Sequence, residues 1–290
     1  MKFRFIEEHR GSHNVEKMAK VLRVSRSGYY AWRVRSSSER ERVDEELLDE
    51  ISQIQEHVRY RYGSPRVTVE LNRRGYRAGH NRVARLMREN GLGRRVRKRF
   101  RSTTDSNHGL KVVEDLVNRQ FNVASRNEAW LSDITYIATS EGWLYLCVVI
   151  DLFSRKVVGW SMSSRLKTDL VLQALMMGVM RRRPPKGMIF HSDRGSQYCS
   201  HAFRRRLQKY RLQQSMCRKG DCWDNAPAES FFKTLKSELC GHRAFRSRRF
   251  ARAAIFEYIE VFYNRVRLHS TLGYLSPSEY EGLESQKLAS

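Results

Sequence analysis

The sequence predicts an α/β core preceded by small all-helical segments. Apolar residues recur at helical spacing over roughly the first hundred residues, and segments of strand character follow farther along the chain. A polar, turn-forming stretch, Ser102–Gly109, separates the two patterns and is typical of a linker. With 290 residues, the chain is long enough for one enzyme-sized unit with small appendages.

The first helical segment covers residues 1–38. Its apolar positions repeat at the spacing of one helix face, and Ser25 or Ser27 is placed to cap a second short helix. These apolar residues are Val15, Met18, Ala19 and Leu22. The pattern is typical of the start of a helix-turn-helix.

The second helical segment, residues 39–100, is predicted to be a helix-turn-helix that binds DNA. Its last helix, 80–87, has an apolar inner face, and a basic outer face is what a helix needs to enter a DNA groove. An ordinary solvated surface would show the same pattern, but the basic block that follows it favours DNA contact. The expected contacts are Arg82, Arg85 and Arg88 on the helix and Arg94, Arg95, Arg97, Lys98 and Arg99 in the block.

Beyond a basic and polar linker, 101–125, the pattern changes to strands. Short turns join three segments, Trp130–Ile137, Trp143–Ile150 and Lys156–Met162, which predicts an antiparallel meander. The middle segment is apolar on both faces, as in a central strand.

Helices and strands then alternate. We expect a helix at 168–180, a strand at 187–191, a helix at 202–210, a strand at 212–216 and a helix at 226–239. This is the element order of a ribonuclease-H-like fold with a five-stranded mixed sheet and flanking helices. The core is expected to span 126–275, followed by a C-terminal tail at 276–290.

The charge points to a polyanionic partner. The chain has 55 Lys and Arg against 31 Asp and Glu, a formal net charge of +24, and such a surplus attracts nucleic acid at long range. A role in solubility alone fits the dense basic blocks less well. Binding to a membrane surface would need a basic helix with a continuous apolar face, and no such helix stands apart from the core.

The cysteines and histidines do not predict a structural metal site. The five cysteines include no Cys-x-x-Cys pair, which argues against zinc and disulfides and fits a reducing cytoplasm. His9 and His13 have the spacing of zinc ligands, but paired cysteines are missing downstream. No apolar run is long enough to span a bilayer, and no secretory signal is present.

Three carboxylates are candidates for one divalent-metal site. Asp133 lies on the first predicted strand, where an ionised side chain needs a cation partner; pairing with an arginine is the alternative. Asp193 follows the fourth strand beside Gly195, and taken alone would be a turn aspartate. Glu229 opens a helix, where simple capping is the alternative, but Lys233 and Lys236 follow it at helical spacing and suit phosphate contacts.

The combination is more specific than its parts. Thirty-five residues separate Asp193 from Glu229, and Lys236 lies seven beyond the glutamate. Together with Asp133 this resembles the D,D-35-E pattern of retroviral-type integrases and bacterial transposases. The segments His191–Tyr198, Asp224–Phe232 and Tyr263–His269 resemble the second-frame (OrfB) transposases of the IS-three group of insertion sequences, over nearly the whole chain.

The resemblance implies Mg²⁺-dependent 3′-end cleavage and strand transfer on double-stranded DNA, at terminal repeats and in target DNA. It implies two Mg²⁺ ions, with Mn²⁺ as a substitute; Asp133 would bridge both, while Asp193 and Glu229 would each complete one. Such ions activate a water or a 3′-hydroxyl and stabilise the leaving oxygen. Arg194 is a further candidate for phosphate binding, and His191 either orients Asp193 or packs at a strand end.

The resemblance also implies partners and a location. We expect a homo-oligomer on DNA, an upstream-frame protein as a partner, no membrane, and a cytoplasmic, nucleoid-associated place in a bacterium. Two other functions remain open. One is a DNA-binding regulatory half of a two-frame transposase, inactive without the upstream frame, and the other is a plain ribonuclease H, which would leave the helical segments unexplained.

Overall fold

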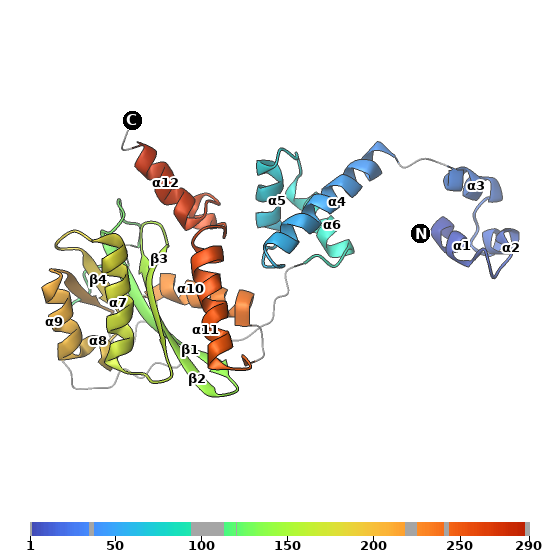
Figure 1. Ribbon diagram of the computed structural model, residues 1–290. Helices are drawn as coiled ribbons and strands as arrows, with labels where there is room; N and C mark the ends of the chain where they lie inside the picture. The colour runs from blue at the N-terminus through green and yellow to red at the C-terminus, as the bar shows by residue number, and fades with distance from the viewer. Residues whose placement is uncertain are drawn as a thin grey trace.

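The computed structural model describes residues 2–34, 38–93, 113–119, 121–217, 225–240 and 244–287. The basic block at 94–99, most of the expected linker and the loop at 218–224 lie outside these ranges. The elements form a small N-terminal helical cluster, a second helical unit and an α/β core (Figure 1).

The N-terminal cluster contains three short helices, α1 (Lys2–His9), α2 (Val15–Val21) and α3 (Arg26–Val34). The helix α1 was not expected from the sequence. Ser25 accepts a hydrogen bond from the Gly28 N–H at 3.0 Å, which confirms it as the cap of α3. The small core of the cluster comprises Ile6, Met18, Ala19 and Tyr29.

The second unit comprises α4 (Glu39–His57), α5 (Ser64–Arg73) and α6 (His80–Glu89), and we call it the α4–α6 unit. Ser38 and Glu41 form a reciprocal capping box that fixes the start of α4. The helix α5 begins with Ser64 and has Pro65 in its first turn. Apolar residues of all three helices are buried together, including Leu47, Ile51, Val67, Leu71 and Val83.

The core sheet has the strand order β3-β2-β1-β4-β5. β1 (Ala129–Thr139), β2 (Gly142–Asp151) and β3 (Val157–Ser163) form the expected antiparallel meander. β4 (Ile189–Ser192) and β5 (Gln213–Met216) join it in parallel, with β4 beside β1. This mixed five-stranded sheet with flanking helices confirms the ribonuclease-H-like architecture.

Helices cover the sheet on both faces. α7 (Thr168–Arg182) packs on β2 and β3, next to α8 (Ser196–Cys199) and α9 (His201–Lys209). α10 (Ala226–Leu235), which ends in a π-helical turn, and α11 (Arg248–Glu257) pack against β1 (Figure 1). The helices α8 and α11 were not expected.

The C-terminal segment is not the expected tail, because Pro277–Lys287 form the helix α12. Glu281 of this helix is buried and forms ion pairs with Arg182 at 2.6 Å and Lys156 at 3.0 Å. It also accepts a hydrogen bond from Ser154 at 2.8 Å. These contacts fix α12 to the α7 and β3 side of the core.

The α4–α6 unit is docked on the C-terminal part of the core. The Tyr62 hydroxyl donates to the Val266 carbonyl at 2.9 Å and accepts from the Leu268 N–H at 3.1 Å. Arg59 pairs with Glu257 at 2.9 Å. One continuous apolar cluster therefore runs from this unit into the core. In the part of the chain that is described, no helix is long and apolar enough to cross a membrane.

Asn264 explains one of the segments singled out in the sequence. Its side-chain oxygen accepts from the Val157 N–H, and its amide donates to the Val157 carbonyl, both at 3.0 Å. The side chain thus pairs with the backbone of the edge strand β3 as a neighbouring strand would. This agrees with a supporting role for the segment Tyr263–His269.

Candidate active site

Strand pairing brings two of the candidate carboxylates together. The parallel pair β1–β4 ends with Ser132 opposite Ser192, and the next residues on the two strands are Asp133 and Asp193. The Asp193 carboxylate accepts from the Gly195 N–H at 3.0 Å, which is the tight turn expected at that glycine. Asp133 accepts from the Ile134 N–H at 2.7 Å.

Glu229 is brought to the same region by α10, which packs across β1. It lies in the first turn of that helix and is exposed. The pKa of Asp133 is raised well above its usual value, first by burial, then by the negative charge of Asp193 and, more weakly, of Glu229. The N–H of Ile134 and the charge of Lys236 oppose this rise. The three carboxylates therefore share one electrostatic site.

The donor chemistry of this site fits a hard divalent cation. Carboxylate oxygens are the ligands that Mg²⁺ prefers, and a cation would offset the mutual repulsion that raises the Asp133 pKa. Across the described ranges, no three His, Cys, Asp or Glu side chains form a ready metal-ligand cluster. In the described residues the acids are thus electrostatic neighbours and not a preformed ligand cluster.

Lys236 lies beside these acids. Burial lowers the pKa of Lys236 overall, although the Cys240 thiol and the Asp133 carboxyl group oppose this. Lys233, in the last turn of α10, is exposed. The helix that carries Glu229 therefore also carries two ammonium groups, one of them next to Asp133.

His191 is a packed strand residue, which was one of the two interpretations left open by the sequence. It is fully buried, with Nδ1 at 2.8 Å from the Ser215 hydroxyl and Nε2 at 3.3 Å from the Cys217 sulfur. Arg194 donates from Nε to the Cys217 carbonyl at 2.6 Å. Both side chains thus hold the end of β4 against β5, which fixes the position of Asp193.

A buried hydroxyl pair behind Asp133 was not found from the sequence. The Ser132 and Tyr198 hydroxyls lie 2.8 Å apart, and the Cys147 sulfur is 3.5 Å from Ser132. This contact links β1 and β2 to α8, the helix that follows Asp193. Only the strand register, which places Ser132 on the face opposite Asp133, could have indicated it.

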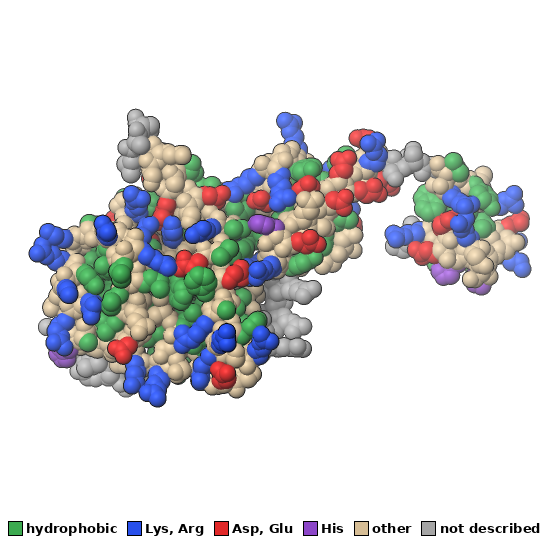
Figure 2. Space-filling model, in the orientation of Figure 1, with side chains coloured by type: hydrophobic (Ala, Val, Ile, Leu, Met, Phe, Trp, Pro, Cys, Tyr) green, Lys and Arg blue, Asp and Glu red, His purple; other side chains and the backbone are tan. Residues whose placement is uncertain are grey.

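The structure places the three arginines of α6 differently. Arg88 is exposed, but Arg82 and Arg85 turn toward α4 and pair with Asp44 at 2.5 and 2.6 Å. Burial alone would raise the Asp44 pKa, yet hydrogen bonds from the two arginines lower it overall. Arg82 and Arg85 are therefore half-buried and held by a carboxylate of the same unit, and their contact with DNA stays a prediction. The visible surface of the core carries scattered Lys and Arg side chains (Figure 2).

The chain matches three family models. Two are described as "Integrase core domain" and match residues 124–222 and 229–284. The third is described as "HTH-like domain" and matches residues 42–100, which include all but the first three residues of the α4–α6 unit.

Curated relatives match nearly the full chain. The transposase InsF for insertion sequence IS3A of Escherichia coli K12 is 44% identical over 287 residues, covering 97% of this chain and 98% of the relative. The insertion element IS600 uncharacterized 31 kDa protein of Shigella sonnei is 44% identical over 263 residues, covering 91% of this chain and 97% of the relative.

Two solved structures are similar at low identity. The simian T-cell lymphotropic virus intasome in complex with PP2A regulatory subunit B56 gamma has a TM-score of 0.47 at 13% identity, covering 80% of this chain and 74% of that chain. The HTLV-2 integrase catalytic core domain in complex with magnesium has a TM-score of 0.40 at 15% identity, covering 54% of this chain and 97% of that chain.

Proposed function

Because this chain belongs to the IS3-family insertion-sequence transposases, we propose that Asp133, Asp193 and Glu229 are its catalytic residues. The chain is a DDE-type DNA transposase, a polynucleotidyl transferase with an integrase core. The observation that supports the assignment best is the β1–β4 register, which sets Asp133 beside Asp193. The charge of Glu229 acts on the same site.

The three carboxylates would hold divalent metal, and we propose two Mg²⁺ ions, replaceable by Mn²⁺. Bound there, the ions supply an activated nucleophile and stabilise the leaving oxygen of an in-line displacement at phosphorus. Lys236, beside Asp133, would bind a non-bridging phosphate oxygen, and the exposed Lys233 would contact the same strand one turn earlier.

The reaction needs no covalent protein intermediate. A water attacks phosphorus at the element end and the 3′ oxygen leaves, so a free 3′-hydroxyl is formed. That hydroxyl then attacks a phosphodiester of target DNA, one P–O bond forming as another breaks. Hydrolysis and strand transfer therefore differ only in the nucleophile that the site positions.

Cleavage of labelled DNA tests the assignment. The purified chain is incubated with Mg²⁺ and duplex carrying the terminal repeats, as wild type, as Asp193→Asn and as Asp49→Asn, an exposed control on α4. We expect 3′-end nicking that is lost only in Asp193→Asn. Nicking that survives in Asp193→Asn would overturn the assignment, and binding without nicking in all three would favour the regulatory alternative.

We further propose that at least two copies assemble on DNA, because joining two element ends to one target requires two sites. An upstream-frame protein is the proposed assembly partner, and the bacterial nucleoid is the proposed location. Light scattering of the protein–DNA complex, with and without that protein, measures the copy number. A complex with a single copy that still joins ends would contradict the proposal.

The other DNA-contact candidates remain proposals. Arg88 on α6 is the one that the structure leaves exposed for such a contact. Arg194 is in contact with the Cys217 carbonyl through Nε, and its other guanidinium nitrogens are proposed to meet phosphate. The block Arg94, Arg95, Arg97, Lys98 and Arg99 is proposed to follow the phosphate backbone.

A further inference from the structure

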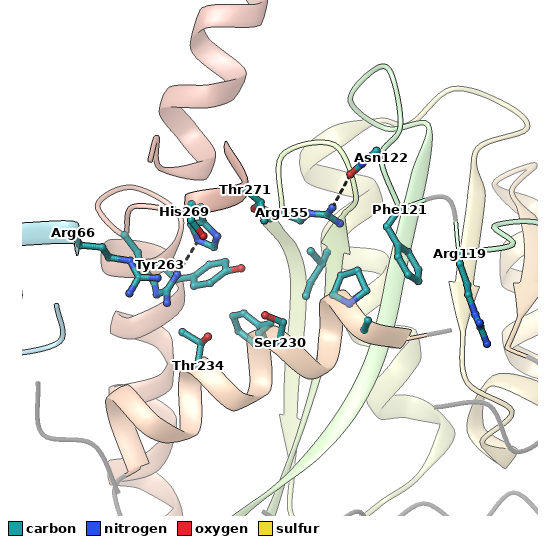
Figure 3. Close-up of a pocket in the computed structure, with 16 residues that line it drawn as sticks. Arg66, Arg119, Phe121, Asn122, Arg155, Ser230, Thr234, Tyr263, His269 and Thr271 are labelled. Atoms are coloured by element: carbon teal, nitrogen blue, oxygen red, sulfur yellow. Dashed lines mark hydrogen bonds between the residues drawn. The ribbon is translucent and has the colours of Figure 1, made fainter. Parts of the chain in front are cut away.

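A basic pocket of about 430 Å³ lies where the α4–α6 unit meets the core (Figure 3). Its volume falls in the range of small-ligand sites. Four arginines from separate parts of the chain line it: Arg66, Arg119, Arg155 and Arg267. Among the described lining residues there is no Asp or Glu, so the pocket itself does not neutralise this charge.

Arg155 is the most informative of these side chains. Its Nη1 is buried and has no hydrogen-bond partner among the residues that the structure describes, while Nη2 donates only weakly to the Asn122 side chain at 3.4 Å. Among the described residues no carboxylate forms an ion pair with it. A buried guanidinium N–H without an acceptor is costly, and an anion in the pocket would remove that cost.

The other arginines differ in how they are held. Arg267 is neutralised by Glu238 through bonds of 3.0 Å. Arg66 reaches the pocket from α5 and donates from Nε to the Leu268 carbonyl at 2.8 Å. Arg66 and Arg155 thus bring charge from both sides of the junction between the α4–α6 unit and the core (Figure 3).

The pKa of His269 reflects the positive charges around it. Its pKa is lowered to about 3, first by burial and then by the positive charges of Arg267, Arg66 and Arg155. The imidazole is therefore neutral at physiological pH, and its Nε2 lies 3.4 Å from Arg267. The positive charges of these three arginines therefore act together at the His269 side of the pocket.

Hydroxyl groups complete the lining. Ser230 and Thr234 come from α10, the helix that carries Glu229, and Ser270 and Thr271 come from the turn before α12. Hydroxyl and guanidinium groups are the usual partners of nucleic-acid phosphates. The pocket is therefore lined by groups that bind phosphate. One of its walls is formed by α10, the helix that carries the proposed catalytic residue Glu229.

We propose that this pocket binds a backbone phosphate of a DNA strand, held jointly by Arg66 of the α4–α6 unit and Arg155 of the core. That the anion is a DNA phosphate rests on the proposed function. That the pocket binds an anion rests on the arginines that line it. One phosphate would then connect the helical unit to the core, and the strand would pass along α10.

Salt-dependent DNA binding tests this proposal in the full chain, with EDTA present so that cleavage plays no part. Fluorescence anisotropy on terminal-repeat duplex compares wild type, Arg155→Gln and Arg205→Gln, an exposed control on α9. Loss of one phosphate contact reduces the slope of log K against log salt by about 0.9. We expect this reduction in Arg155→Gln alone, and equal slopes in all three proteins would overturn the proposal.

A second pair of variants guards against misfolding of Arg155→Gln. Thr271 is exposed at the pocket, so Thr271→Glu and Thr271→Gln differ only in charge. We expect weaker DNA binding in Thr271→Glu alone, and equal affinities would contradict the proposal.

Inorganic phosphate distinguishes the two sources of the anion. If phosphate raises the melting temperature of wild type but not of Arg155→Gln, and DNA binding is equal in both, the site takes a free anion and the DNA assignment is wrong. Because these measurements need no cleavage, a failed Asp193→Asn test leaves them unaffected.

Discussion

Ser132 and Ser192 lie opposite each other in the parallel pair of β1 and β4, and each is followed by an aspartate. This register alone makes Asp133 and Asp193 neighbours, although 59 residues separate them in the sequence. Burial, and then the negative charge of Asp193, raise the pKa of Asp133. The metal-free site is therefore a local source of instability.

Replacing Asp133 by Asn is expected to stabilise the metal-free protein. A carboxyl group whose folded pKa lies above its unfolded value of 3.8 loses stability as pH rises from that value through the folded pKa. The Asn side chain has no such loss, so Asp133→Asn should melt above wild type in EDTA at neutral pH. Thermal melts from pH 4 to 8 measure the difference.

Added Mg²⁺ should reverse the order of the two melting temperatures, so that wild type melts above Asp133→Asn. Ligand at a hundredfold excess over Kd stabilises a folded protein by about 2.7 kcal/mol, and wild type, unlike Asp133→Asn, should gain this fully. The Asp49→Asn variant serves as the control and should follow wild type. Equal Mg²⁺-induced shifts in wild type and Asp133→Asn would mean that Asp133 holds no metal.

The Glu238–Arg267 ion pair is expected to be essential for stability. Both side chains are buried, with 1% and 6% exposed, and the Tyr258 hydroxyl also donates to Glu238 at 2.8 Å. The negative charge of Glu238 outweighs burial and raises the Arg267 pKa. Removing one partner of such a pair leaves a buried charge, which costs about 3–5 kcal/mol.

Arg267→Met should therefore lower the free energy of unfolding in urea by that amount. The neighbouring Arg265 is exposed, so Arg265→Met should change it by less than about 0.5 kcal/mol. Equal losses in the two variants would show that the pair contributes no more than surface charge.

Gly159 should tolerate no side chain, because β3 approaches α7 closely there. A Cβ on Gly159 would lie 2.2 Å from the Ala174 carbonyl oxygen and 2.8 Å from the Gly178 nitrogen, both backbone atoms. We expect Gly159→Ala to lower stability by more than about 4 kcal/mol. Gly282→Ala on α12, where nothing lies within 4 Å, should instead be neutral or stabilising by about 1 kcal/mol. Circular dichroism melts compare the two.

Arg88 and Arg82 are expected to have different roles on α6. Arg88→Gln should weaken DNA binding and reduce the salt slope by about 0.9, with little change in melting temperature. Arg82→Gln should mainly lower the melting temperature, since Arg82 pairs with Asp44. Anisotropy and thermal melts on both variants check this, and the reverse pattern would refute the proposed contact.

Much of the core could be predicted from local patterns. The strands Trp130–Ile137 and Trp143–Ile150 were found because an apolar, β-branched and aromatic run is typical of buried strands. The helices α8 and α11 were missed for different reasons. The first has only four residues, and the second carries arginines and exposed phenylalanines that blur its apolar face.

The sequence by itself determined the fold class and the family and predicted the three acids, because each of these depends on residue types at fixed spacings. The tertiary structure decided how the parts meet. It turned Arg82 and Arg85 onto Asp44, packed the expected tail as α12 and placed Arg66 and Arg155 at one pocket. Such contacts join residues far apart in the chain, and only the three-dimensional packing of the helices and the sheet brings them together.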